Sequence, residues 1–264
     1  MNRELIAIKK SILHMTHYSH SSHVGSCLSI AEILYTLYFR TLRIDPLSPL
    51  NEDRDRFILS KGHGSAALYA TLAEKGFFPK EYLDRFYIDA GMLPGHLDKD
   101  AVPGVEVSSG SLGHGLSIGL GMAIANRQSG NPGRIFVVLG DGECNEGSVW
   151  EAIMLAATLK LANLTAIVDF NKLQSFGRTN EVIDQHNMST RWRDFGWDAH
   201  DVDGHDPDAM ERLFNAPQDR PKVLIAHTVK GKGVSFMEDR LEWHYKSPND
   251  DQYRQALEEL GGDA

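Results

Sequence analysis

The sequence predicts one α/β domain over residues 1–264, built as a doubly wound, mainly parallel sheet flanked by helices. Three observations support this fold class. Short apolar runs of strand length alternate with longer segments in which apolar residues recur at helical spacing. Two such runs, 134–140 and 163–170, enclose a helical segment, and a strand–helix–strand unit of this size makes its strands parallel. Neither a repeat nor a low-complexity linker marks a second domain.

The first third of the chain is predicted to be mainly helical. Helical spacing of apolar residues predicts helices at Glu4–Tyr18, Ile30–Phe39, Ala66–Lys75 and Lys80–Phe86. The sequence SHSSHVGS (19–26) between the first two is polar, so we expect a loop there. A short strand at Arg56–Leu59 leads into SKGHG. The irregular stretch 90–110 is too long for a simple connection in a compact domain, which makes it a candidate site loop.

The rest of the chain alternates between strands and helices. The glycine-rich segment 110–127 is interpreted as a loop that runs into a buried helix, whose small residues allow close approach of another backbone. The predicted strands are 134–140, 163–170, 197–202 and 222–228. The predicted helices are 147–160, 190–195, 207–214 and one at the end of the chain.

Composition narrows the classes of function. The chain has 27 Lys and Arg against 36 Asp and Glu, and its net charge of -9 argues against nucleic acid or an anionic membrane as partner. Its two cysteines, Cys27 and Cys144, belong to no CxxC or Cys/His pattern, which disfavours a disulfide scaffold and a zinc site. No apolar run approaches the roughly 18–20 residues that span a bilayer, and no signal cleavage site follows the N-terminus. We therefore expect a soluble, cytoplasmic protein.

Polar residues follow two neighbouring strands at the point where each ends. Asp141 leaves one strand in LGDGECNEG, and Asn171 leaves the next, with the carbonyl of Leu173 nearby. Ligands collect at the carboxyl ends of parallel strands, and these oxygen donors suit Mg²⁺ that keeps other positions for phosphate and water. Gly140 and Gly142 leave room for a diphosphate. Gly-Asp-Gly alone is more simply a turn, so the interpretation depends on Asn171. Neither a P-loop nor a Rossmann fingerprint occurs.

At these residues the sequence resembles the thiamine-diphosphate family, whose motif is GDG followed one βαβ unit later by Asn. The resemblance narrows to the transketolases, because several motifs of that family occur in order over nearly the whole chain. They are SSHVGS (21–26), DRFILSKGHG (55–64), PGH (94–96), PGVEVSSGSLGHG (103–115), GDGECNEG (140–147) and NK (171–172). The implied fold is the thiamine-diphosphate-binding fold, with a domain of the diphosphate-binding (PP) type.

This resemblance implies two cofactors, thiamine diphosphate and Mg²⁺, and the residues that hold them. The implied metal ligands are Asp141, Asn171 and the Leu173 carbonyl. The implied cofactor-binding residues are His63, Gly110, Ser111, Leu112, Gly142, Glu143, Asn171 and His244. Glu146 and Glu151 resemble the acidic residues that this family has near its subunit interface and metal loop. The chain departs from the family at Val24, which replaces a proline and makes that loop less rigid, and at His114, where many members have Gln.

Four of the twelve histidines are candidates for catalysis. The resemblance assigns His23, His63, His96 and His244 to the substrate channel or the diphosphate, and imidazoles suit proton transfer at sugar hydroxyls near neutral pH. The three-residue spacing of His14, His17, His20 and His23 imitates a metal face, but such steps drift around an α-helix and the helix is expected to end near Ser19, so coincidence is favoured. We interpret as structural the remaining residues His186, His200, His205 and His227, and Cys144 as a loop thiol.

The match covers the amino-terminal half of a transketolase and then stops. It implies a partner, the C-terminal pyrimidine-binding subunit, in an α2β2 heterotetramer that transfers a two-carbon ketol unit from a ketose (phosphate) donor to an aldose acceptor, as in pentose phosphate metabolism. Two alternatives remain open. One is another thiamine-diphosphate enzyme component, of the 2-oxo acid dehydrogenase or deoxyxylulose-phosphate synthase type, and the other is a non-catalytic regulatory subunit of the same fold.

Overall fold

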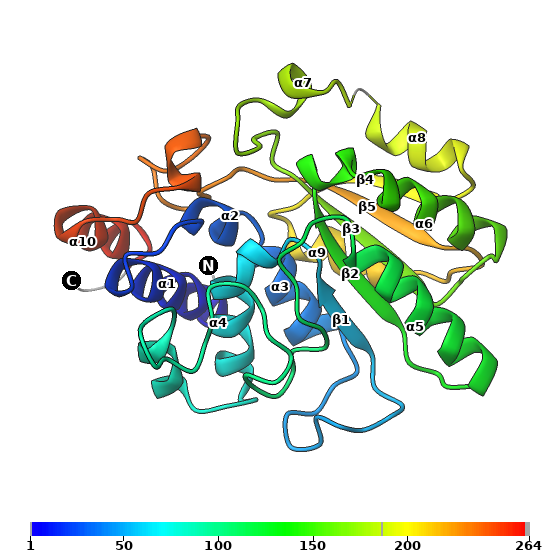
Figure 1. The fold of residues 1–264 in the computed structure, drawn as a ribbon, viewed down its shortest axis with the longest axis horizontal. Coiled ribbons are helices and arrows are strands. Elements are labelled where there is room, and N and C mark those ends of the chain that lie inside the picture. Colours follow the sequence, from blue (N-terminus) through cyan, green and yellow to red (C-terminus); the bar gives the residue numbers. More distant parts are fainter. Residues whose placement is uncertain (1, 186, 262–264) are drawn as a thin grey trace.

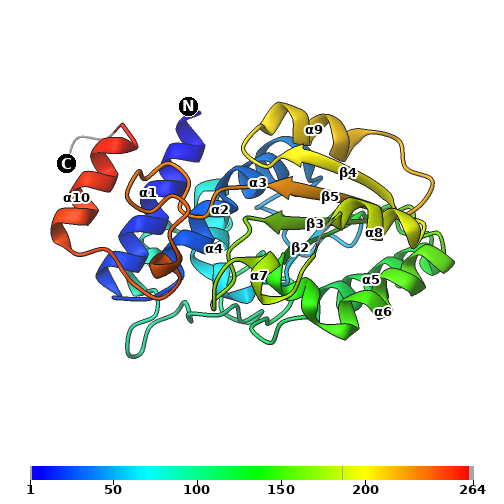
Figure 2. The ribbon, with the colours of Figure 1, turned by 90° about the horizontal axis from the view of Figure 1, so that it is seen from above.

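Five strands form one parallel sheet in the computed structural model, which describes residues 2–185 and 187–261 (Figure 1). The strands are β1 (Arg56–Leu59), β2 (Ile135–Gly140), β3 (Leu164–Phe170), β4 (Asp198–Asp203) and β5 (Lys222–His227). Their order is β1-β2-β3-β5-β4, and each neighbouring pair is parallel. Every predicted strand is confirmed, and the shared direction brings all five carboxyl ends to one edge of the sheet (Figure 2).

Helices cover both faces of the sheet, as a doubly wound fold requires (Figure 2). The core on one face is shared by α1 (Arg3–Tyr18), α2 (Val24–Ser29), α3 (Ala31–Thr36), α4 (Ser65–Lys75) and α9 (Pro207–Asn215), and the core on the other face by α5 (Gly115–Ser129), α6 (Gly147–Thr158) and α8 (Met188–Asp194). Successive side chains of a strand point to opposite faces of the sheet, so each strand contributes to both cores. Phe136 and Val138 of β2 pack into the core with α1–α4 and α9, and Val137 packs into the core with α5, α6 and α8.

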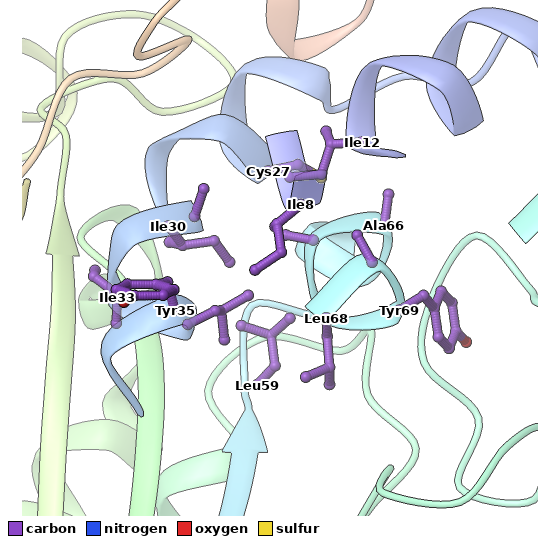
Figure 3. Packing of buried hydrophobic residues seen from close by; sticks show 14 of the residues in the cluster. Ile8, Ile12, Cys27, Ile30, Ile33, Tyr35, Leu59, Ala66, Leu68 and Tyr69 are labelled. Carbon is purple, nitrogen blue, oxygen red and sulfur yellow. The ribbon is translucent and has the colours of Figure 1, made fainter. Parts of the chain in front are cut away.

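The larger core lies where α1, α3 and α4 meet (Figure 3). Ile8 and Ile12 of α1, Ile33 of α3 and Leu68 of α4 are almost completely buried there. The spacing of four between Ile8 and Ile12 places both on the same helical face, as the apolar pattern predicts. Deleting one such side chain typically costs about 2–5 kcal/mol, so this layer anchors the elements that carry the site loops.

Two further short α-helices lie after β3 and near the end of the chain. α10 (Asp250–Glu259) packs against α1, and α7 (Thr179–Val182) lies beyond the carboxyl end of β3 (Figures 1 and 2). The segment 250–259 confirms the helix expected at the end of the chain, whereas α7 was not predicted. Across residues 2–185 and 187–261, each helix is too short or too polar to cross a bilayer.

The predicted loop at 19–26 is partly wrong, because α2 begins at Val24. His23 adopts a left-handed conformation with φ of 75°, which turns the chain, and Val24 is then fully buried. The polar residues around Val24 led to the prediction of a loop, although a short buried helix begins there. Similarly, the helix expected at 80–86 is a 3-10 helix at Lys80–Arg85, and α3 gives way at Leu37–Thr41 to a π-helical turn.

The glycine-rich helix α5 is only partly as predicted. A Cβ on Gly119 would lie 2.6 Å from Cγ2 of Val137, so close packing on the sheet is confirmed at this position. A Cβ on Gly121 would meet open space, and Ile118 is exposed. The prediction of a buried helix is therefore wrong for the outer face of α5, which the sheet does not cover.

Candidate active site

A cavity of about 440 Å³ opens where the parallel strands end, at the edge at which ligands bind in open α/β sheets. Nearly all the predicted site residues line it, although they come from loops far apart in the sequence. These are His23, His63, His96, Gly110, Leu112, Asp141, Gly142, Glu143, Asn171, Leu173 and His244. Ser111 is the exception, since it lies with His114 in an adjoining cavity at the start of α5. The structure thus brings the predicted residues together, and their chemical roles stay predictions.

Asp141 is held in place by three hydrogen bonds from protein groups. Its Oδ1 accepts from the backbone N–H of Gly142 at 2.7 Å, and its Oδ2 accepts from the backbone N–H of Lys172 at 2.7 Å and from the Thr179 hydroxyl at 2.9 Å. Burial, and then the charge of Asp169, raise the pKa of Asp141. A cation beside this carboxylate would offset that penalty.

Asn171 and Leu173 are fixed by their neighbours in the same way. Nδ2 of Asn171 donates to Asp169 at 2.8 Å, which orients the amide, and Oδ1 accepts from the Leu173 N–H at 3.0 Å. The Leu173 carbonyl accepts from Nζ of Lys230 at 3.2 Å. A carbonyl or amide oxygen has two lone pairs, so each of these oxygens retains one for a metal.

The three predicted ligands therefore fit Mg²⁺. Asp141 Oδ1, Asn171 Oδ1 and the Leu173 carbonyl each accept one hydrogen bond from the protein and keep further capacity, and all three residues line the same cavity. One carboxylate, one amide oxygen and one carbonyl make a hard, all-oxygen donor set, which leaves half of an octahedron for phosphate oxygens and water.

Glu143 holds three site loops together. Its Oε1 accepts from the Ser60 hydroxyl and, at 2.9 Å, from the Gly113 N–H, and its Oε2 accepts from the Gly140 N–H at 3.0 Å. These bonds join the ends of β1 and β2 to the loop before α5. Burial raises the pKa of Glu143 despite the bonds. The carboxylate lines the cavity, but its contacts within the chain make it a brace between loops, and its predicted cofactor contact stays a prediction.

The four predicted catalytic histidines form one cluster. The ring centroid of His23 lies 5.2 Å from that of His63, 6.0 Å from that of His96 and 4.9 Å from that of His244. Burial, followed by nearby charges that include Lys61 and Lys230, lowers the pKa of His23 to about 4, and the same effects lower the pKa of His63 well below its usual value. His23 and His63 are therefore neutral near pH 7.

Lys230 determines which nitrogen of His244 carries the proton. Its Nζ lies 2.9 Å from Nδ1 of His244, and because an ammonium can only donate, Nδ1 must accept. The neutral ring then carries its proton on Nε2. Burial and the charge of Lys230 lower the pKa of His244 to about 3, and burial lowers the pKa of Lys230 to about 8. The bonded partners of this ammonium, His244 and the Leu173 carbonyl, are neutral, so its charge is available to an anionic ligand.

Sequence reasoning missed three buried charged residues at the site: Lys61, Asp169 and Lys230. Lys61 donates to Asp169 at 2.6 Å, and Ser29 and Thr228 also donate to this carboxylate, which is fully buried. The signal was present, because an acidic residue inside the apolar run of β3 requires a cationic partner. Lys230 gave a weaker signal, as it lies in the polar sequence TVKGKG.

The remaining histidines lie apart from the cavity, except His186, which lies outside the described residues. His200 pairs with Asp198 at 2.9 Å and His227 with Asp201 at 2.8 Å. His205 bonds Glu32 at 3.1 Å through Nδ1 and accepts from the Val229 N–H through Nε2. These partners agree with the structural roles expected. The Cys144 thiol is buried, which raises its pKa and keeps it protonated.

Comparison with known proteins identifies close relatives. A family model described as transketolase, thiamine diphosphate binding domain, matches residues 6–264. The chain is 43% identical to an apulose-4-phosphate transketolase subunit of Actinobacillus succinogenes over 98% of this chain and 95% of that one. It is also 43% identical to 6-deoxy-6-sulfo-D-fructose transketolase subunit SqwG of a Clostridium species, over 90% and 87%. Transketolase from Leishmania mexicana superposes with a TM-score of 0.92 at 27% identity, and the match covers 99% of this chain but 41% of that one.

Proposed function

The chain belongs to the transketolase family through its thiamine-diphosphate-binding domain, and on that premise we propose that it is the diphosphate-binding subunit of a two-component transketolase. The complete enzyme transfers a two-carbon ketol unit from a ketose (phosphate) donor to an aldose acceptor. The observation that carries the proposal is the cavity at the strand ends, where oxygen donors for Mg²⁺, the Lys230 ammonium and four histidines line one space.

In this proposal the chain holds the cofactor by its charged end. Asp141, Asn171 and the Leu173 carbonyl would hold Mg²⁺, which would leave positions open to the diphosphate and water. Lys230 adds positive charge beside the diphosphate, since its ammonium is buried between neutral partners. Bound thiamine diphosphate supplies the chemistry that breaks and forms the carbon–carbon bond of the sugars. The chain contributes placement and electrostatics.

The histidine cluster handles the protons of the sugar hydroxyls. His244 donates from Nε2, because its Nδ1 accepts from Lys230. His23 and His63 have lowered pKa values, so at neutral pH each ring has one nitrogen that donates and one that accepts. Such rings can bind a hydroxyl, take its proton and return it. With His96 they form the wall along which a sugar chain would lie.

A second polypeptide completes the site in this proposal. Relatives of nearly the same length carry the name subunit, and this chain spans 41% of a solved transketolase. Phe176 is 83% exposed on the rim of the cavity, with Val182 and Ile183 close by in sequence and also exposed. Apolar groups gathered on such a rim indicate a surface that a partner covers. We assign it to the pyrimidine-binding subunit, in an α2β2 heterotetramer, since closed twofold assemblies dominate. The cytoplasmic location stays a prediction.

The test is reconstitution with the product of the adjoining reading frame as the candidate partner. The isolated chain, given thiamine diphosphate, Mg²⁺ and a panel of ketose phosphates, sulfo-ketoses and aldoses, is expected to show no transfer. Activity should appear on addition of the partner and reach a plateau at equal stoichiometry, since a cofactor bound across an interface stabilises only the assembled state. Ketol transfer by the isolated chain would refute the two-component site.

A further inference from the structure

Two segments from different parts of the chain meet over the cavity. One, residues 171–185, follows β3 and is here named the metal segment, since it contains Asn171 and Leu173. The other, residues 229–246, follows β5 and is named the histidine arm, since it contains Lys230 and His244. They touch through the bond from Lys230 to the Leu173 carbonyl and through the Tyr245 hydroxyl, which donates to the Ser175 carbonyl at 3.1 Å.

A third contact joins the two segments at the surface. Arg178 of the metal segment donates to both oxygens of Asp239 in the histidine arm, with Nη1 to Oδ1 at 2.6 Å and Nη2 to Oδ2 at 2.7 Å. This fork-to-fork geometry fixes direction as well as distance. Each side chain is about half exposed, so the pair contributes little to the stability of the whole fold. Its value lies in the geometry that it imposes locally.

On each side, the backbone returns in a loop that brings the charged residue next to a residue of the site. Arg178 lies opposite Leu173 in a short antiparallel bridge, and it directly precedes Thr179, whose hydroxyl bonds Asp141. Asp239 has a left-handed φ of 56°, and its N–H donates to the Lys230 carbonyl at 2.9 Å. The ion pair is therefore an outer link parallel to the inner bond between Lys230 and Leu173.

From this arrangement, which rests on the proposed function for its chemistry, we infer that Arg178 and Asp239 form a clasp that positions Lys230. The clasp holds the histidine arm in register with the metal segment, so that the Lys230 ammonium reaches the Leu173 carbonyl and Nδ1 of His244 together. Arg178 and Asp239 are positioning residues, because they act through Lys230. Loss of the clasp should loosen both segments and misplace the ammonium beside the diphosphate.

Hydrogen exchange of the full chain tests the clasp without partner, cofactor or substrate. Arg178→Ala should speed exchange in the histidine arm, and Asp239→Asn, which keeps a side chain that tolerates φ above zero, should speed exchange in the metal segment. Each substitution is thus expected to loosen the segment to which it does not belong. Arg220→Ala is the matched control, since Arg220 forms an exposed pair with Asp219 just before β5, at the opposite end of that strand from the histidine arm. Changes confined to the mutated segment would overturn the clasp.

A second measurement asks whether the clasp acts through Lys230. In the assembled enzyme, Arg178→Ala should weaken thiamine-diphosphate binding about fivefold, the upper range for an exposed pair. In a Lys230→Met background the same substitution should have almost no further effect, whereas a general loss of stability would be equal in both backgrounds. Equal effects would refute the positioning role. If reconstitution yields no ketol transfer but the cross-segment exchange is seen, the proposed function fails and the clasp stands.

Discussion

The two ends of the sheet each bury an aspartate among cationic partners, yet they are built for different purposes. At the amino-terminal edge, Asp55 accepts hydrogen bonds from the backbone and guanidinium groups of Arg43 and Arg134. At the carboxyl-terminal edge, Asp169 accepts from Lys61 and from hydroxyl and amide groups. The cavity beside Asp55 is about 10 Å³, hardly room for one water, while about 440 Å³ opens at the other end.

This difference shows how to tell structural from functional buried charge. Burial alone would raise the pKa of Asp55, but its hydrogen bonds from Arg134 and Arg43 lower it. Both carboxylate oxygens accept hydrogen bonds from these two residues. At the carboxyl end the polar groups are satisfied only in part, since Lys230, Asp141 and Asn171 line the large cavity and keep hydrogen-bonding or ligand capacity beyond their bonds within the chain. A network whose polar groups are all bonded within the chain, as at Asp55, stabilises the fold. A network with unused bonding capacity beside a cavity, as at the carboxyl end, can bind a ligand.

The largest effect is expected from the histidines at the carboxyl end. His63→Ala and His96→Ala should each lower turnover of the assembled enzyme by about 10²- to 10⁴-fold, the range for lost proton transfer, and cofactor affinity should change little in His96→Ala, since of the two only His63 is also expected to bind the cofactor. Steady-state kinetics and calorimetry measure the two quantities separately. Wild-type turnover in both variants would show that these histidines have structural roles only. It would also weaken the distinction between a structural amino-terminal edge and a functional carboxyl-terminal edge of the sheet.

Asp55→Ala should show the reverse pattern. Removing one member of a buried, hydrogen-bonded charge network leaves Arg43 and Arg134 without their carboxylate partner and costs about 3 kcal/mol of the free energy of unfolding. The folded protein should still bind thiamine diphosphate as the wild type does, because Asp55 lies at the far edge of the sheet. Urea unfolding gives the first quantity and titration of the assembled enzyme the second. A loss of cofactor affinity with unchanged stability would contradict the assignment of this edge as structural.

A smaller effect is the pH dependence of stability, because His23 at the carboxyl end and Asp55 at the amino end of the sheet titrate in different pH ranges. His23 has a pKa of about 4 against 6.5 for a free histidine, so between these values the unfolded chain binds a proton that the folded chain does not. Titration of His23 therefore leaves the free energy of unfolding unchanged above pH 6.5 and lowers it as the pH drops from 6.5 toward 4. The pKa of Asp55 is lowered from 3.8, so its contribution is lost only below that value.

His23→Asn isolates the first of these contributions. Asparagine tolerates the left-handed backbone at this position and does not titrate. The variant should lose less free energy of unfolding than the wild type between pH 7 and pH 5, as measured by urea unfolding at each pH. Parallel loss in the two proteins would mean that His23 is not held neutral by the fold.

The sheet could be predicted almost to the residue, because its inner strands β2, β3 and β5 carry nearly continuous apolar runs. Ile135–Gly140 and Leu164–Phe170 are buried on both faces, and such strands leave an unambiguous signal in a sequence. The site residues at the ends of these strands follow from the same signal, since parallel strands bring Asp141 and Asn171 to one edge. The resemblance to a family supplied the histidines, which no spacing rule would have gathered.

What could not be predicted depends on contacts between distant segments. α2 begins inside a polar sequence because Val24 is buried against other elements, and the four residues of α7 are too few for a periodic pattern. Lys230 is functional in our account only because Leu173 and His244 lie beside it in space. The Arg178 to Asp239 link likewise joins residues 61 positions apart, and a single sequence carries no sign of such a pair.

The most direct test of the account is calorimetric titration of the assembled enzyme with thiamine diphosphate, with and without Mg²⁺. Wild-type affinity should depend strongly on Mg²⁺. Asp141→Ala and Asn171→Ala remove metal ligands, so each should weaken binding by more than the roughly 10- to 100-fold that follows loss of an outer-shell partner and should abolish the dependence on Mg²⁺. Unchanged affinity in both variants would show that the carboxyl ends of β2 and β3 are not where this chain holds the metal and the diphosphate.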